Sequence, residues 1–128
     1  MQYFLSSFAK RLPLIVAGDC NENETSGSAV NWLCSAAGPG LTNALPLFDQ
    51  SSATWHWNLP VVGERRDRYD HIMFSEEFIC GGANVVDTGF DGSDHFPVRA
   101  DLFLSIKSNQ QDNLGQKGKA MVSEAFTK

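Results

Sequence analysis

The sequence predicts a mixed α/β domain in which one sheet of about five strands carries two helices on one face. The run "LIVA" at 14–17 is continuous, apolar and of strand length, which is typical of a strand buried on both faces. The last apolar segment, "FPVRADLFL" at 96–104, alternates through Val98, Ala100 and Leu102 as a strand does. Between these two strands, apolar side chains from Val30 onward recur at helical spacing.

The first half of the chain contains both expected helices. Apolar side chains three and four residues apart predict a short amphipathic helix over 2–10, which Pro13 ends. The strand at 14–17 runs into the polar stretch "GDCNENETSGS". A second helix is expected to begin near Ser28 and to end before "GPG" at 38–40.

The second half supplies the remaining strands. Residues 41–52 are ambiguous, with an irregular strand around Leu45 and Leu47 as one interpretation. The segment "ATWHW" predicts a short strand, and the segment 58–68, "NLPVVGERRDR", predicts a loop with three arginines. Further strands are expected at "YDHIMFS" (69–75), "ANVVD" (83–87) and "FPVRADLFL" (96–104).

Length and composition indicate one globular domain. The chain has 128 residues, of which 42% are hydrophobic. We assign the domain to 1–104 and expect the polar segment 105–128 to be a loosely held tail. The formal net charge of −5 excludes a broad basic surface for nonspecific binding to nucleic acid.

The cysteines and the N-terminal segment predict a cytoplasmic protein without a membrane span. Cys20, Cys34 and Cys80 form no C-x-x-C pair, which favours reduced thiols. No apolar run approaches the roughly 18 residues that a membrane span needs. Lys10 and Arg11 interrupt the apolar N-terminal run instead of preceding it, unlike the charges of a signal peptide.

The expected strands also raise a question of coverage. Segments such as "LIVA" and "HIMF" present apolar side chains to both faces of the sheet, whereas two short helices cover only one face. Leaving apolar surface exposed to water forgoes roughly 25 cal/mol of folding free energy per Å². Something beyond these two helices is therefore expected to cover the second face.

Polar residues gather at the ends of the expected strands, in "GDCN", "TWHW", "RYD" and "SDH". Loops in this position are held rigidly by the sheet, and function concentrates there. The residue types suit phosphoryl chemistry, because carboxylates bind Mg²⁺ or orient water, and imidazole and amide groups contact phosphate oxygens. The candidates are Asp19, Asn21, Asp70, Asp94 and His95.

In this order and spacing, "PLIVAGDCN", "TW", "RYDHIMFS" and "SDHFPV" resemble the C-terminal half of the endonuclease/exonuclease/phosphatase (DNase I-like) superfamily. The resemblance covers about residues 10–104. Members of this superfamily include abasic-site endonucleases, DNase I-like nucleases, sphingomyelinases and inositol-polyphosphate phosphatases. The resemblance implies half of a four-layer sandwich, in which two sheets pack face to face with helices outside.

The resemblance also implies roles for individual residues. Asp19 would position or activate the nucleophilic water, and Asn21 would contact phosphoryl oxygens or a metal. Asp94 would help to bind the divalent cation, Mg²⁺ or Mn²⁺. His95 would contact the scissile phosphate, and Asp70 would orient its imidazole.

Other residues near these motifs carry less specific expectations. Trp55 would line the substrate cleft, although a core position is about as well supported. Arg68, with its neighbours Arg65 and Arg66, would meet substrate phosphate or lie in a solvated loop. Packing or surface roles are favoured for His56 and His71, and solvent-facing positions before the second helix for Glu22 and Glu24. Cys20 replaces the aromatic residue that the superfamily usually has between the Asp and the Asn.

One half of the superfamily's site has no counterpart here. Its N-terminal half supplies a Glu that is a principal metal ligand, and residues 1–13 contain no acidic side chain. The resemblance therefore predicts a phosphoester hydrolase that is completed by a homodimer or by a separate N-terminal half. The alternative is a non-catalytic half-domain that folds as a homodimer and keeps relic site residues. Nucleic acid, phospholipid and inositol phosphate all stay open as substrates.

Overall fold

The computed structural model describes residues 12–87, 89 and 92–105. The helix expected at 2–10 and the tail expected from 106 onward lie outside these residues. Within them, no helix combines the length and the apolar character that a membrane crossing requires. Cys20, Cys34 and Cys80 are free thiols.

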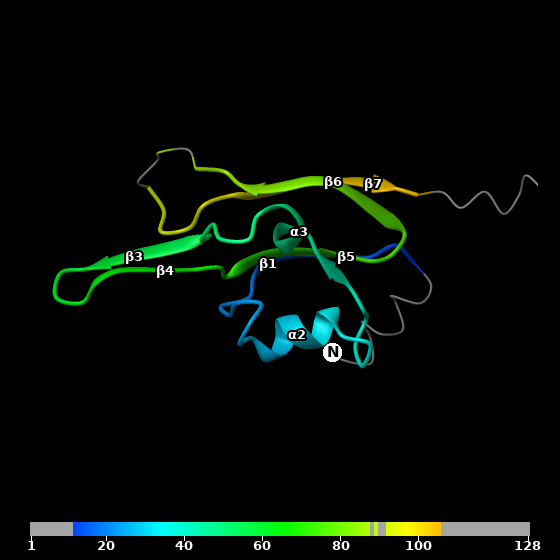
Figure 1. Ribbon diagram of the computed structural model, residues 1–128, viewed down its shortest axis with the longest axis horizontal. Coiled ribbons are helices and arrows are strands. Elements are labelled where there is room, and N and C mark those ends of the chain that lie inside the picture. The colour runs from blue at the N-terminus through cyan, green and yellow to red at the C-terminus, as the bar shows by residue number, and fades with distance from the viewer. Residues whose placement is uncertain (1–11, 88, 90–91, 106–128) are drawn as a thin grey trace, which may run out of the picture.

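The described residues form three antiparallel sheets, so the expected single sheet is wrong (Figure 1). The alternation of side chains predicts where strands lie, but it does not show which strands share hydrogen bonds. A three-stranded sheet has the order β1-β5-β2, and two hairpins pair β3 with β4 and β6 with β7. The strands are β1 (Ile15–Asp19), β2 (Thr42–Asn43), β3 (Trp55–Leu59), β4 (Gly63–Asp67), β5 (Asp70–Phe74), β6 (Phe78–Val85) and β7 (Val98–Leu104).

The central strand β5 separates two small hydrophobic cores. Neighbouring residues of a strand point to opposite faces, so Met73 and Phe74 enter different cores. On the Met73 side, helix α2 (Ser28–Cys34) packs Val30 and Leu33 against the strand. The Glu22 carboxylate accepts a hydrogen bond from the Val30 N–H at 2.7 Å, which supplies a side-chain cap that Gly27 cannot provide.

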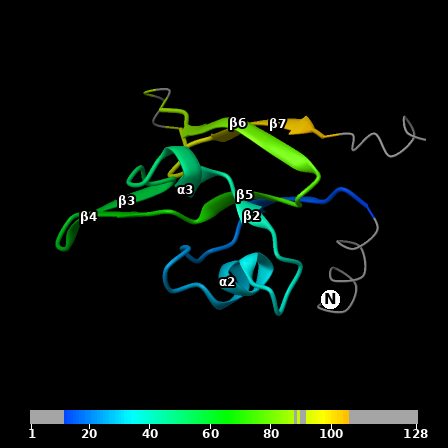
Figure 2. The same ribbon diagram turned by 45° about the vertical axis from the view of Figure 1, so that its right-hand side comes forward.

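The other face of β5 is covered from within the chain. Phe74 packs with Ala44, Leu45 and Ala83, which belong to the β2–α3 segment and to β6. Figure 2 shows the β6–β7 hairpin as a layer on the side of β5 opposite to α2, with α3 (Leu45–Phe48) beside that hairpin. The two helices therefore lie on opposite faces of β5, which corrects the expectation that they share one face.

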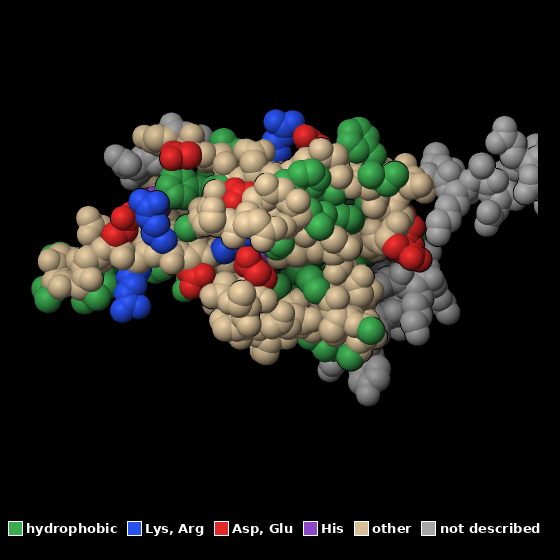
Figure 3. All heavy atoms as spheres, in the orientation of Figure 1, with side chains coloured by type: hydrophobic (Ala, Val, Ile, Leu, Met, Phe, Trp, Pro, Cys, Tyr) green, Lys and Arg blue, Asp and Glu red, His purple; other side chains and the backbone are tan. Residues whose placement is uncertain are grey.

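Two segments differ from their expected local structure. Residues around Leu45 form α3 instead of an irregular strand, because Pro46 stands in the first helical turn, where its fixed φ favours a helix. Residues 58–68 are not a loop, since β3 and β4 pair from Trp55↔Asp67 to Leu59↔Gly63. Gly63, with φ of 83°, enables the turn of this hairpin. Apolar side chains stand at its tip (Figure 3), where Val61 is 96% exposed.

Strand β6 begins at Phe78, earlier than the expected start at residue 83, and a bulge between Cys80 and Gly82 interrupts its regular pairing with β7. A Cβ at Gly81 would lie 2.9 Å from a ring atom of Phe103, so a larger residue there would displace this exposed ring. The expected strands at 14–17, 69–75 and 96–104 and the helix start at Ser28 are confirmed within one or two residues.

Candidate functional site

Strand pairing brings the first two candidate residues together. β1 and β5 are antiparallel, and Asp19 at the end of β1 is the register partner of Asp70 at the start of β5. These residues are far apart in the sequence, and the ladder fixes their separation. Asp19 and Asp70 therefore lie side by side at one end of the three-stranded sheet.

His95 joins this pair from the segment that precedes β7. Its Nδ1–H donates to Asp70 Oδ2 at 2.7 Å, and its Nε2 lies 3.8 Å from Asp19 Oδ2. The longer distance exceeds a hydrogen bond, so Asp19 faces the imidazole without binding it directly. The structure thus brings together three of the residues predicted from the sequence.

The charges around His95 favour its protonated form. The hydrogen bond to Asp70 is the main cause that raises the pKa of His95 above its ordinary value, and partial burial opposes it. The negative charges of Asp70, Asp19 and Asp94 raise this pKa further. The imidazole is therefore both oriented and biased toward carrying a proton.

A tight turn after β1 shapes the Asp19 end of the site. The Asn21 N–H donates to Asp19 Oδ1 at 2.8 Å, and Asn21 has φ of 52°, a left-handed conformation that asparagine tolerates well. This bond fixes one carboxylate oxygen, while Oδ2 is the atom that faces His95. Cys20, between these residues, packs against the α2 core, and burial is the main cause that raises its pKa.

Asp94 and Trp55 form a second contact beside the imidazole. The Trp55 indole N–H donates to Asp94 Oδ2 at 3.0 Å, and Trp55 forms an isolated antiparallel bridge with His95. The His56 N–H donates to the Asp94 carbonyl at 2.9 Å, so this segment lies along the start of β3. The predicted metal ligand and the predicted cleft residue are therefore bonded to each other.

Sequence reasoning missed Thr54, which precedes the tryptophan of the "TW" motif. Its side chain is fully buried, and its Oγ1 accepts the N–H groups of Tyr69 and Asp70 at 2.9 and 3.0 Å. The only available signal was a threonine inside an otherwise aromatic strand segment, and such a residue is common in strands.

The site opens on a groove of about 470 Å³ between β1 and the segment before β7. Polar and apolar groups share its wall. Its lining residues include Asp70, His95, Ala17, Ile72, Pro97 and Val98. The groove leaves open space beside the imidazole.

The described residues do not by themselves fit a Mg²⁺ site. Over residues 12–87, 89 and 92–105, no three His, Cys, Asp or Glu side chains are grouped so that they could hold a metal ion. The carboxylate of Asp70 is bonded to His95, and that of Asp94 is bonded to Trp55. A divalent cation would need at least one further oxygen ligand from elsewhere.

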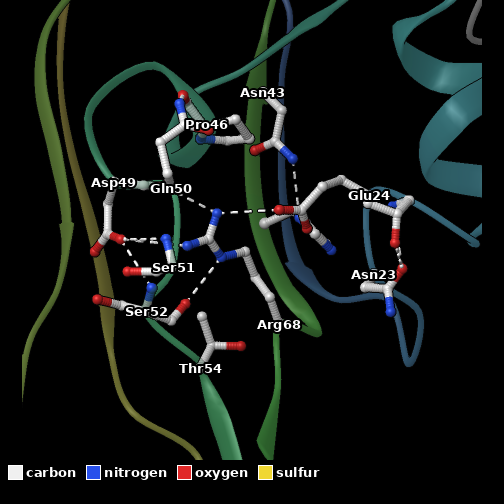
Figure 4. A network of polar contacts seen from close by, with 12 residues as sticks. Asn23, Glu24, Asn43, Pro46, Asp49, Gln50, Ser51, Ser52, Thr54 and Arg68 are labelled. Carbon is white, nitrogen blue, oxygen red and sulfur yellow. Dashed lines mark hydrogen bonds and ion pairs between the residues drawn. The ribbon is translucent and has the colours of Figure 1, made fainter.

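Arg68 occupies a structural position in the protein interior (Figure 4). It is 5% exposed, and its guanidinium donates to the backbone oxygens of Ser52 and Asp49. It also pairs with the carboxylates of Glu24 at 3.0 Å and Asp49 at 3.4 Å. Hydrogen bonds from Ser52 are the main cause that lowers the pKa of Asp49. With these acceptors already bound, we leave Arg68 out of the candidate site.

Other polar residues near the motifs also have structural partners. The two acidic residues before α2 are not solvent-facing, since Glu22 caps that helix and Glu24 pairs with Arg68. Buried His71 donates from Nε2 to the Glu22 carbonyl at 2.9 Å, and its Nδ1 is hydrogen-bonded to the Asn43 side-chain amide at 2.9 Å, so the ring has a packing role. The His56 ring stacks on Phe96 with centroids 4.7 Å apart.

No family model, curated protein or solved structure matches this chain.

Proposed function

We propose that this chain carries one half of a divalent-metal-dependent phosphoester hydrolase site, as the C-terminal half of an endonuclease/exonuclease/phosphatase-like fold. The observation that supports the proposal best is the position of His95, hydrogen-bonded to Asp70 and facing Asp19. These three residues come from β1, β5 and the segment before β7. They converge beside a groove, where a phosphoester would reach them.

Each residue has a role that follows from its contacts. Because Nδ1 of His95 is fixed on Asp70, Nε2 is the atom that would donate a proton to a phosphoryl or leaving-group oxygen. Asp70 would keep the imidazole oriented and balance its positive charge. Asp19 Oδ2, which lies 3.8 Å from His95 Nε2, would hold or deprotonate the attacking water on the groove side of the imidazole.

The cation in this proposal is Mg²⁺ or Mn²⁺, which prefer oxygen ligands. When bound, it would neutralise charge on the phosphoryl group. Asp94 and Asp19 offer carboxylate oxygens, and the proposal assigns the missing ligand to a partner. That partner is a second copy of this chain or a separate N-terminal half.

Exposed apolar groups next to the groove support such a partner. Ile15 is 46% exposed, and Ala17 on the same face of β1 is exposed as well. A symmetric homodimer would bury this strand in an isologous interface. Light scattering on the purified protein tests this part, and a monomer at micromolar concentration would leave the separate N-terminal half as the proposed partner. The cytoplasm is the proposed location, for which the three free thiols are suited.

The lack of a three-ligand cluster in the described part of the chain favours one alternative, a non-catalytic half-domain. Hydrolysis of bis-p-nitrophenyl phosphate with Mg²⁺ or Mn²⁺ distinguishes the two. We expect metal-dependent turnover that falls by at least about 100-fold in His95→Ala and is unchanged in Asp101→Asn, which removes a surface carboxylate bonded to Arg99 on β7. No turnover with either metal, at any protein concentration that gives the assembled form, would favour the non-catalytic half-domain.

A further inference from the structure

We infer that Thr54 is a positioning residue that sets the distance between Asp70 and His95. The inference rests on the proposed site at these two residues, although it does not require that the site be active. Thr54 contacts neither the imidazole nor the Asp70 carboxylate through a hydrogen bond. It acts through the backbone on both sides of the pair.

The Thr54 side chain holds the Asp70 side of the pair. Its Oγ1 accepts from the N–H groups of two consecutive residues, Tyr69 at 2.9 Å and Asp70 at 3.0 Å. Asp70 is the first residue of β5, so these N–H groups lie where the β1–β5 ladder begins. The Trp55 and Tyr69 rings, with centroids 5.2 Å apart, pack next to this contact.

The Thr54 backbone holds the His95 side of the pair. Its carbonyl accepts from the Phe96 N–H at 2.7 Å, one residue beyond the imidazole. Its own N–H donates to the Asp67 carbonyl at 2.9 Å, which anchors Thr54 to the end of β4. One fully buried residue is thus bonded to the segments that carry Asp70 and His95.

This arrangement assigns the hydroxyl a specific role. Valine has nearly the same shape as threonine but offers no acceptor, so Thr54→Val would leave two N–H groups without their partner. The start of β5 would then shift or loosen, and the 2.7 Å bond between Asp70 and His95 would lengthen. Serine keeps the acceptor and should keep the geometry.

NMR at one fixed pH, on metal-free protein, tests the inference without an activity assay. The signature is the hydrogen-bonded Nδ1–H resonance of His95, together with the exchange rates of the Tyr69 and Asp70 amides. In Thr54→Val we expect loss of the Nδ1–H resonance and about tenfold faster exchange of the Asp70 amide. Thr54→Ser should restore both signals, and Thr42→Val, the same change at an exposed threonine of β2, should leave them unchanged.

A folded Thr54→Val protein that keeps the wild-type Nδ1–H resonance would overturn the inference, whatever its stability. If Thr54→Val does not fold, the exchange rates of the Tyr69 and Asp70 amides in the wild type and in Thr54→Ser test the inference instead. Protected Tyr69 and Asp70 amides in both proteins support the inference, and rapid exchange of the Asp70 amide in either contradicts it. If hydrolysis is absent while these signals depend on Thr54, the proposed function fails and the inference stands.

Discussion

His95 donates from Nδ1 to Asp70 Oδ2 across 2.7 Å, and this bond joins the segment before β7 to the first residue of β5. β5 and β7 belong to different sheets. The contact therefore ties the two sheets together, and the same hydrogen bond is the main cause that raises the pKa of His95. Both effects lead to measurable predictions.

Replacing Asp70 should change the titration of His95. The hydrogen bond to Asp70 is the main cause of the raised pKa of His95, and the Asp70 charge adds to it. Asp70→Asn weakens that hydrogen bond and removes the charge. We expect the pKa of His95 to fall toward the ordinary histidine value, as followed by NMR of the imidazole. Asp101→Asn, which removes a carboxylate bonded to Arg99 on β7, is the matched control and should leave the pKa of His95 unchanged. An unaltered His95 pKa in Asp70→Asn would show that the 2.7 Å bond does not form in solution.

The same pKa predicts how stability depends on pH. A histidine whose pKa is higher in the folded than in the unfolded protein binds its proton more tightly when folded. Its contribution to stability is complete below the unfolded-state pKa of about 6.5 and is lost as the pH rises through the higher folded-state pKa. The stability difference between wild type and His95→Gln should therefore be larger at about pH 5.5 than at about pH 8.5. Urea unfolding at both pH values measures it, and equal differences would contradict the prediction.

Arg68 should matter for stability far more than its neighbours in the sequence. Arg68→Met leaves the partly buried carboxylates of Glu24 and Asp49 without their cation. We expect a loss of about 3 kcal/mol in the free energy of unfolding. Arg66→Met is the control, because its side chain is exposed and its ion pair with Glu64 lies at the surface, so the loss should stay below about 0.5 kcal/mol. Similar losses in both variants would show that Arg68 is not the structural centre of this network.

Helix α3 provides a test of the second core. Leu45 is fully buried against Phe74 and Ala83, whereas Leu47, two residues later, is exposed. Leu45→Ala should cost about 2–5 kcal/mol in urea unfolding, and Leu47→Ala less than about 1 kcal/mol. If Leu45→Ala costs no more than Leu47→Ala, the packing of α3 between β5 and β6 is wrong.

Local pattern predicted the elements well where side-chain periodicity was clear. The strands around Val16, Met73 and Leu102 and the helix that begins at Ser28 follow from apolar spacing alone. Pairing was not predictable, because hydrogen bonds between strands leave no periodic mark on one sequence. The segment "ATWHW" predicts the start of β3, whereas β4 is not predictable because the polar "ERRD" shows no apolar face. The sequence pattern also gives no sign that β6–β7 covers β5.

The candidate site was predictable in part. Asp19, Asp70 and His95 were singled out as polar residues at strand ends, and the structure brings them together. Arg68 was proposed as a substrate contact because it lies among arginines, but burial cannot be seen from that pattern. The role of Thr54 could not be predicted either, because the two N–H groups that it accepts belong to residues 15 and 16 positions further along the chain.

The proposed function depends most on Asp19 and His95 acting on the same bound phosphoester. Rates of bis-p-nitrophenyl phosphate hydrolysis by wild type, Asp19→Asn, His95→Ala and the double variant test this directly. If the two residues act as one unit, the double variant should be no slower than the worse single variant, within about threefold. Losses that multiply, or turnover that survives both substitutions, would contradict the site that we assign.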